Sequence, residues 1–138
     1  MARRVLAVIA AVAAWMASIT AVGWVMRASW PHYARVADAM AFTLPMLGAR
    51  LAIGALATLL AGWVASLIAR RSAMARLATG LLLLVLFIPQ HVHLWPRFPV
   101  WYHLTFLLSL VPLTWLGGSL PTPSPKMAPH PAASFADR

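Results

Sequence analysis

Hydrophobic residues follow one another in four long blocks that carry almost no charge. The blocks cover about residues 5–26, 47–69, 73–90 and 99–117. An α-helix rises about 1.5 Å per residue, so blocks of this length match the ~30 Å hydrocarbon core of a bilayer. They are apolar all round instead of along one stripe, which is typical of helices surrounded by lipid. The pattern predicts an all-α membrane protein with four transmembrane helices in one domain over residues 1–118.

Composition supports this class. The 138 residues are 62% hydrophobic and only 9% charged, with a mean hydropathy of +0.81. A water-soluble fold of this size needs more charged surface than these residues provide. The chain has no cysteine, which excludes disulfides, thiolate metal sites and thiol catalysis.

The two ends of the predicted domain differ in character. The first block follows a basic start, Met1 to Arg4, which also fits a cleaved secretory signal peptide. The block is longer than the apolar region of a typical signal peptide, so we expect a retained first helix, with cleavage as the alternative. After the last block, residues 119–138 contain five prolines and few bulky apolar side chains. This composition predicts a disordered tail.

The basic residues indicate an orientation. The net charge is +9, but the Lys and Arg residues stand singly or in pairs between apolar blocks, which is typical of topology signals and not of a nucleic-acid-binding patch. With four spans, one side of the membrane holds seven Lys and Arg residues and the other holds four. The positive-inside rule therefore predicts that both termini are cytoplasmic. In a bacterium the protein would lie in the inner membrane, with residues 27–46 and 88–105 facing outward.

The first outward connection, residues 27–45, is only partly polar and predicts a short helix lying in the membrane interface. Pro31 suits the first turn of a helix. Residues behind it recur at helical spacing: Tyr33, Ala37, Met40 and Leu44. Arg35 and Asp38 are three residues apart, so we expect them to form an ion pair on the wet face.

Small residues recur every four positions in the second block, at Gly54, Thr58, Gly62 and Ser66. In lipid no hydrophobic force drives helices together, and small residues let their backbones approach closely. We expect this face to pack either on the first helix or on a separate membrane partner or second copy. The first helix has its own small residues at similar spacing: Ala7, Ala11, Ala14, Ser18 and Ala21. Arg50, near the start of the block, is expected to extend its side chain to the interface.

Candidate chemistry is concentrated in residues 88–105, where His91, His93 and His103 lie among prolines and tryptophans. Together with His32 of the other outward connection they form a candidate metal site, because imidazole binds zinc and copper. His91 and His93 point the same way only if the segment is extended, since residues two apart on a helix face nearly opposite directions. A haem between His91 and His103 is a second alternative, and ordinary interface histidines are the third.

Two further features belong to the same end of the protein. Arg97 is a candidate contact for an anion or a lipid headgroup. Aromatic residues gather at one level, and an aromatic belt at the membrane surface explains them, although a quinone or lipid pocket uses the same residue types. They are Trp24, Trp30, Tyr33, Trp95, Trp101 and Tyr102.

Residue types and motifs that are missing from the blocks or from the whole sequence argue against several classes of function. None of the four blocks carries Asp or Glu, which is unfavourable for a carrier of the usual carboxylate kind, and the chain has no phosphate-binding loop or nucleophile elbow. We therefore expect a small integral membrane protein without catalysis or a bound cofactor, an accessory or scaffold component that contacts the bilayer and a membrane-protein partner or a second copy. A metal- or haem-binding protein or enzyme with an outward-facing histidine site is the alternative, and a small channel or transporter is the third.

Overall fold

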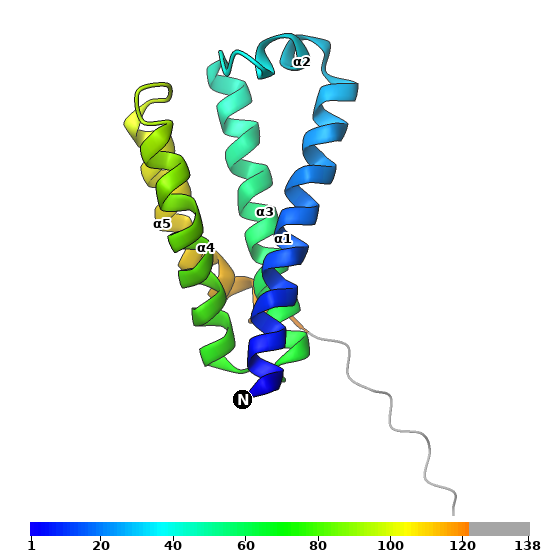
Figure 1. Ribbon diagram of the computed structural model, residues 1–138. Coiled ribbons are helices and arrows are strands. Elements are labelled where there is room, and N and C mark those ends of the chain that lie inside the picture. Colours follow the sequence, from blue (N-terminus) through cyan, green and yellow to red (C-terminus); the bar gives the residue numbers. More distant parts are fainter. Residues whose placement is uncertain (122–138) are drawn as a thin grey trace, which may run out of the picture.

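The computed structural model describes residues 1–121, which form five helices and no strand (Figure 1). The helices are α1 (Ala2–Ser29), α2 (Pro31–Ala37), α3 (Leu44–Ile68), α4 (Ala73–His93) and α5 (Val100–Gly117). Four of them, all except α2, are long and apolar enough to cross a membrane. For this part of the chain, the prediction of an all-helical protein with four such helices is confirmed. Most of the tail predicted to be disordered, residues 122–138, lies outside the described residues.

The chain runs up and down, so that its connections lie at two opposite ends (Figure 1). The N-terminus, the α3–α4 turn and the end of α5 lie at one end, which we call the terminal end. The short helix α2 and the α4–α5 connection lie at the other, which we call the α2 end. Toward the α2 end the pair α4 and α5 leans away from α1 and α3 (Figure 1).

Small residues allow the helices to pack closely in the half of the bundle toward the terminal end. Ala61 and Ala65 of α3 are fully buried, and they belong to one core cluster with Ala11 and Trp15 of α1. A side chain at Gly62 would collide with the backbone carbonyl of Thr114 in α5. Such contacts hold helix backbones together through dispersion forces, which is what small residues permit in lipid.

The four small residues of α3 are all buried, but they meet two different helices. The hydroxyl of Thr58 accepts a hydrogen bond from the indole of Trp15 in α1 at 3.0 Å. The other three lie against α5 or the residue that follows it, and Ser66 Oγ donates to the carbonyl of Gly118 at 2.7 Å. The stripe is therefore not mainly an α1 face. It binds α5 along most of its length because α3 lies between α1 and α5.

The short helix α2 begins at Pro31, whose fixed φ and missing N–H suit a first helical position. Tyr33 and Ala37 are its buried residues, and they pack with Met46 at the start of α3. Met40 then takes a left-handed conformation, with φ of 54°, which turns the chain toward α3. Through Tyr33, this short helix places a phenol against the end of the four-helix bundle.

Candidate functional site

A cavity of about 260 Å³ lies between the four long helices toward the α2 end. Residues from every helix line it, and an adjoining cavity of about 350 Å³ shares Tyr33, Arg50, Gln90 and several apolar neighbours with it. The position of the cavity follows from the packing. Small residues pack the helices closely toward the terminal end, whereas large aromatic residues separate them here.

Aromatic rings form the deep wall of the cavity. Trp15 packs against Phe87 with 4.6 Å between ring centroids, and Phe87 meets Phe106 edge-on at 5.5 Å. The hydrogen bond from Trp15 to Thr58 fixes the indole in place. The wall is therefore apolar and rigid, as is usual for sites that enclose small molecules.

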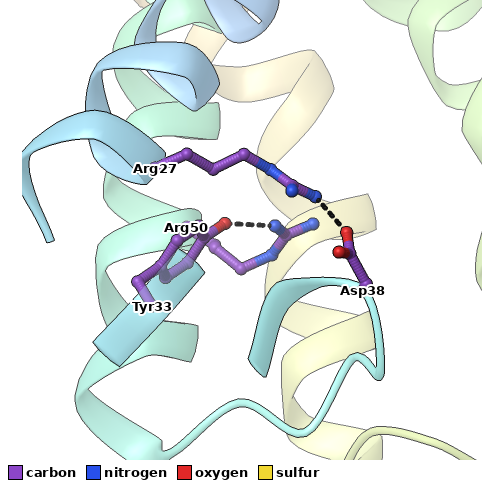
Figure 2. A network of polar contacts seen from close by, with 4 residues as sticks. All are labelled: Arg27, Tyr33, Asp38 and Arg50. Atoms are coloured by element: carbon purple, nitrogen blue, oxygen red, sulfur yellow. Dashed lines mark hydrogen bonds and ion pairs between the residues drawn. The ribbon is translucent and has the colours of Figure 1, made fainter. Parts of the chain in front are cut away.

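Arg50 supplies the charge of the cavity. Its Nη1 donates to the hydroxyl of Tyr33 at 2.7 Å, drawn in Figure 2, and its Nε donates to the hydroxyl of Tyr102 at 3.4 Å. The guanidinium carbon lies 4.6 Å from the ring centroid of Phe42, in cation–π contact. Arg50 is thus half-buried and held by α2, the following loop and α5, and it does not simply extend into water.

No carboxylate neutralises Arg50 within residues 1–121. The only acid there, Asp38, pairs with Arg27 at 2.9 Å (Figure 2). In the structure Asp38 thus pairs with Arg27 and not with Arg35, the partner expected from the sequence. The helix ends at Ala37, and the turn that follows directs Asp38 toward the last turn of α1. The side chains of Arg27 and Asp38 are 50% and 83% exposed, so this pair contributes at most about 1 kcal/mol.

The polar atoms that face the cavity are mainly hydrogen-bond donors. A guanidinium has five N–H groups, and the Nη2 of Arg50 has no partner among the described residues. The hydroxyls of Tyr33 and Tyr102 accept from Arg50, which leaves their own O–H groups free to donate. Gln90, which both donates and accepts, is the exception. A ligand that fits such a lining is rich in acceptors.

Two of the candidate histidines meet beside the cavity. The Nδ1 atoms of His91 and His103 are 2.8 Å apart, and both side chains are buried, His103 completely. Trp95 stacks on the His103 ring at 4.9 Å, and Phe106 stacks on His91 at 4.6 Å. His91 lines the cavity, so the pair connects it with the core of α5.

The other two candidate ligands do not join this pair. His93 and His32 are exposed, and no group of three or more His, Cys, Asp or Glu in the described residues is arranged to hold a metal ion. The reason is local: α4 continues through Pro89 to His93, so His91 and His93 point in different directions.

The distance between His91 and His103 fits a shared proton. Two nitrogens on one tetrahedral zinc ion lie about 3.3 Å apart, which is longer than the 2.8 Å observed. The rings also touch each other directly, at 5.0 Å between centroids, and leave no room for a haem between them. The geometry thus does not favour a metal or a haem held by this pair.

Sequence reasoning named His91 and His103 but not the centre of the cavity. Arg97, the predicted anion contact, is exposed on the α4–α5 connection and forms no side-chain hydrogen bond with described residues. Arg50 instead lies at the cavity, where its N–H groups can donate to a hydrogen-bond acceptor. The available signal was a single arginine inside an apolar block together with two tyrosines far away in sequence. Comparison of the chain with protein-family models, with curated proteins and with solved structures finds no match.

Proposed function

We propose that the protein binds the acceptor-rich head of a membrane-soluble amphiphile in the cavity around Arg50, without catalysing a reaction. The observation that carries this proposal is a half-buried guanidinium that has no carboxylate partner within residues 1–121. It is held by Tyr33 and Tyr102 over an aromatic-lined cavity. An unpaired charge within a membrane helix is costly, and such residues usually mark a functional site.

The chemistry of the lining selects the ligand. A carboxylate, a phosphate or a carbonyl oxygen accepts hydrogen bonds from Arg50 and the two tyrosine hydroxyls. The tail of the ligand would lie against apolar residues such as Ile19 and Leu94, which both line the cavity. Binding of this kind needs no metal and no nucleophile.

The orientation that we propose places the cavity in the outer half of the membrane. Arg3, Arg4 and the arginines of the α3–α4 turn lie at the terminal end, which supports cytoplasmic termini under the positive-inside rule. In this arrangement α2 lies in the outer interface, the chain beyond α5 lies on the cytoplasmic side, and the membrane is a bacterial inner membrane. Single cysteines introduced into this cysteine-free chain test it: labelling from outside is expected at position 32 and not at position 71, and the reverse pattern contradicts the orientation.

We further propose that the protein is an accessory component of a larger membrane assembly. The short connections and the small number of polar side chains inside the bundle support this role. Thr79 and Thr114 each donate to a carbonyl of their own helix, and so they do not line a polar path of the kind a channel needs. Crosslinking in native membranes is expected to capture a membrane partner or a second copy. Recovery of the monomer alone contradicts the accessory role.

Titration with a charged and a neutral amphiphile tests the binding function. Oleate carries a carboxylate, and monoolein carries the same chain on a neutral glycerol head. We expect oleate to bind the full chain in detergent micelles more tightly than monoolein, measured by isothermal titration calorimetry. Arg50→Gln should weaken oleate binding at least about tenfold, because a charge-assisted hydrogen bond is lost.

The matched control is Arg97→Gln, which removes the same charge from an exposed position at the same end of the molecule. It should leave oleate binding unchanged. Equal losses in the two variants would mean that oleate responds to net charge and not to the cavity, and the proposal would then fail.

A further inference from the structure

The histidine pair beside the cavity shares one proton. Its two Nδ1 atoms are 2.8 Å apart, so one of them carries a hydrogen and the other accepts it. The Nε2 atom of His103 is buried and has no hydrogen-bond partner among the described residues. The Nε2 atom of His91 is not sealed in this way, and His91 lines the cavity.

When both histidines are neutral, either His91 or His103 can donate the hydrogen between the two Nδ1 atoms. The two choices differ in whether the buried Nε2 atom of His103 carries a hydrogen. If His91 donates, His103 carries its own hydrogen on Nε2, where a buried N–H has no acceptor. If His103 donates, its Nε2 is an unprotonated lone pair, and the hydrogen of His91 is on Nε2. An orphaned buried N–H is rarer in proteins than an unfilled acceptor. The second arrangement is therefore favoured, and it makes His91 a donor toward the cavity.

Tyr102 lies between this donor and those of Arg50. Its hydroxyl is 3.4 Å from Arg50 Nε, and its ring stacks with His91 at 6.1 Å between centroids. The two oxygens of a carboxylate share one carbon and do not span two separated donors. The carbonyl oxygens of a quinone lie on opposite edges of a six-membered ring, and a flat ring packs well against the aromatic wall.

We propose that the cavity binds a membrane-soluble quinone in its oxidised form, with one carbonyl oxygen on Arg50 and the other on Nε2 of His91. His103 is the positioning residue that keeps His91 in the donor tautomer. A quinol binds less well: its hydroxyl oxygens can still accept hydrogen bonds, but its own O–H groups add donors to a lining that already consists mainly of donors. This inference rests on the proposed binding function and concerns binding alone, with no transfer of electrons.

Equilibrium binding of decyl-ubiquinone and of its quinol to the full chain tests the selectivity. Calorimetry under argon keeps the quinol reduced. We expect the quinone to bind about tenfold more tightly, which corresponds to one unsatisfied donor. His103→Phe keeps an aromatic ring under Trp95 but removes the nitrogen, and it should bring the ratio of the two affinities close to one. His93→Phe, at an exposed position on the helix that carries His91, should leave the ratio unchanged.

A second measurement needs no variant. Nitrogen-15 NMR of the histidine-labelled wild-type chain, assigned to each residue through the backbone, reports which ring nitrogens carry hydrogen. We expect the hydrogen on Nδ1 of His103 and on Nε2 of His91, with a coupling between the two Nδ1 atoms across the hydrogen bond. A hydrogen on Nε2 of His103 would overturn the positioning role, whether or not the His103 variant folds.

The outcomes separate this inference from the function on which it rests. If oleate binds in an Arg50-dependent way and the quinone does not bind, or binds no better than its quinol, the quinone assignment is wrong and the proposed function stands. If neither oleate nor quinone binds, both fail. Tenfold quinone selectivity that depends on His103 supports both.

Discussion

The hydroxyl of Thr58 connects two helices at the base of the cavity. Its Oγ1 accepts from Trp15 Nε1 at 3.0 Å and donates to the carbonyl of Gly54 at 2.7 Å. Both Trp15 and Thr58 are almost completely buried. An indole N–H buried without an acceptor costs about 1–3 kcal/mol, so this one contact fixes the wall of the cavity.

Thr58→Val should lower the free energy of unfolding by about 1–3 kcal/mol, because it removes the acceptor of Trp15 and keeps the volume of the side chain. Equilibrium unfolding in mixed micelles with increasing SDS measures the loss. Thr79→Val is the matched control, since the Thr79 hydroxyl donates only to the carbonyl of Ala75 in its own helix. Similar losses of unfolding free energy in both variants would show that the hydrogen bond to Trp15 contributes nothing to stability.

At the residue scale, sequence patterns found the histidines but missed their arrangement. His91 and His103 were recognisable as polar residues in an apolar chain, whereas their pairing depends on the angle at which α4 and α5 pack. Arg50 looked like an ordinary interface arginine because its partners, Tyr33 and Tyr102, lie 17 and 52 residues away. Contacts of this range depend on tertiary packing, which periodicity does not report.

At the element scale, α3 is the central helix. Its small residues meet α5, where Gly62 lies against the carbonyl of Thr114 and Gly117 lies against the backbone of Leu59. Neither position has room for a methyl group. The two glycines therefore set the distance between α3 and α5 in the half of the bundle toward the terminal end. They also determine how far the cavity can extend toward that end.

Gly62→Ala should destabilise the protein by about 1–3 kcal/mol, because the added methyl group forces the backbones of α3 and α5 apart. Gly48→Ala is the control in the same helix: nothing lies within 4 Å of its added methyl group, so stability should stay the same or rise slightly. SDS-induced unfolding, followed by circular dichroism, compares the two. A Gly62 variant as stable as the Gly48 variant would contradict the close approach.

Helix positions were predictable because lipid imposes length and continuous apolarity on each span. The stripe of small residues also identified a packing face. Its main partner was not predictable, since several helices carry small residues and sequence spacing does not choose among them. The end of α4 was similarly open: the apolar block was predicted to end near residue 90, but the helix continues to His93, so His91 and His93 face different directions.

At the scale of the whole molecule, the bundle is closed at one end and opened at the other. Small residues close the terminal end, and aromatic residues, Arg50 and the histidine pair surround the cavity toward α2. This division gives the proposed function its physical basis: the half toward the terminal end is closely packed, and the half toward the α2 end contains the cavity in which we propose that a ligand binds. Every helix contributes to the lining of the cavity, so ligand binding should also stabilise the half of the bundle toward the α2 end against separation of its helices.

Photoaffinity mapping tests this account most directly. A fatty acid with a diazirine on its chain is bound to the protein in lipid nanodiscs and activated by light, and the labelled residues are identified by mass spectrometry. We predict label at cavity residues such as Trp15 and Phe87, lost in Arg50→Gln and retained in Arg97→Gln. Label confined to outward apolar positions such as Val25 and Leu108, at equal yield in both variants, would contradict the account.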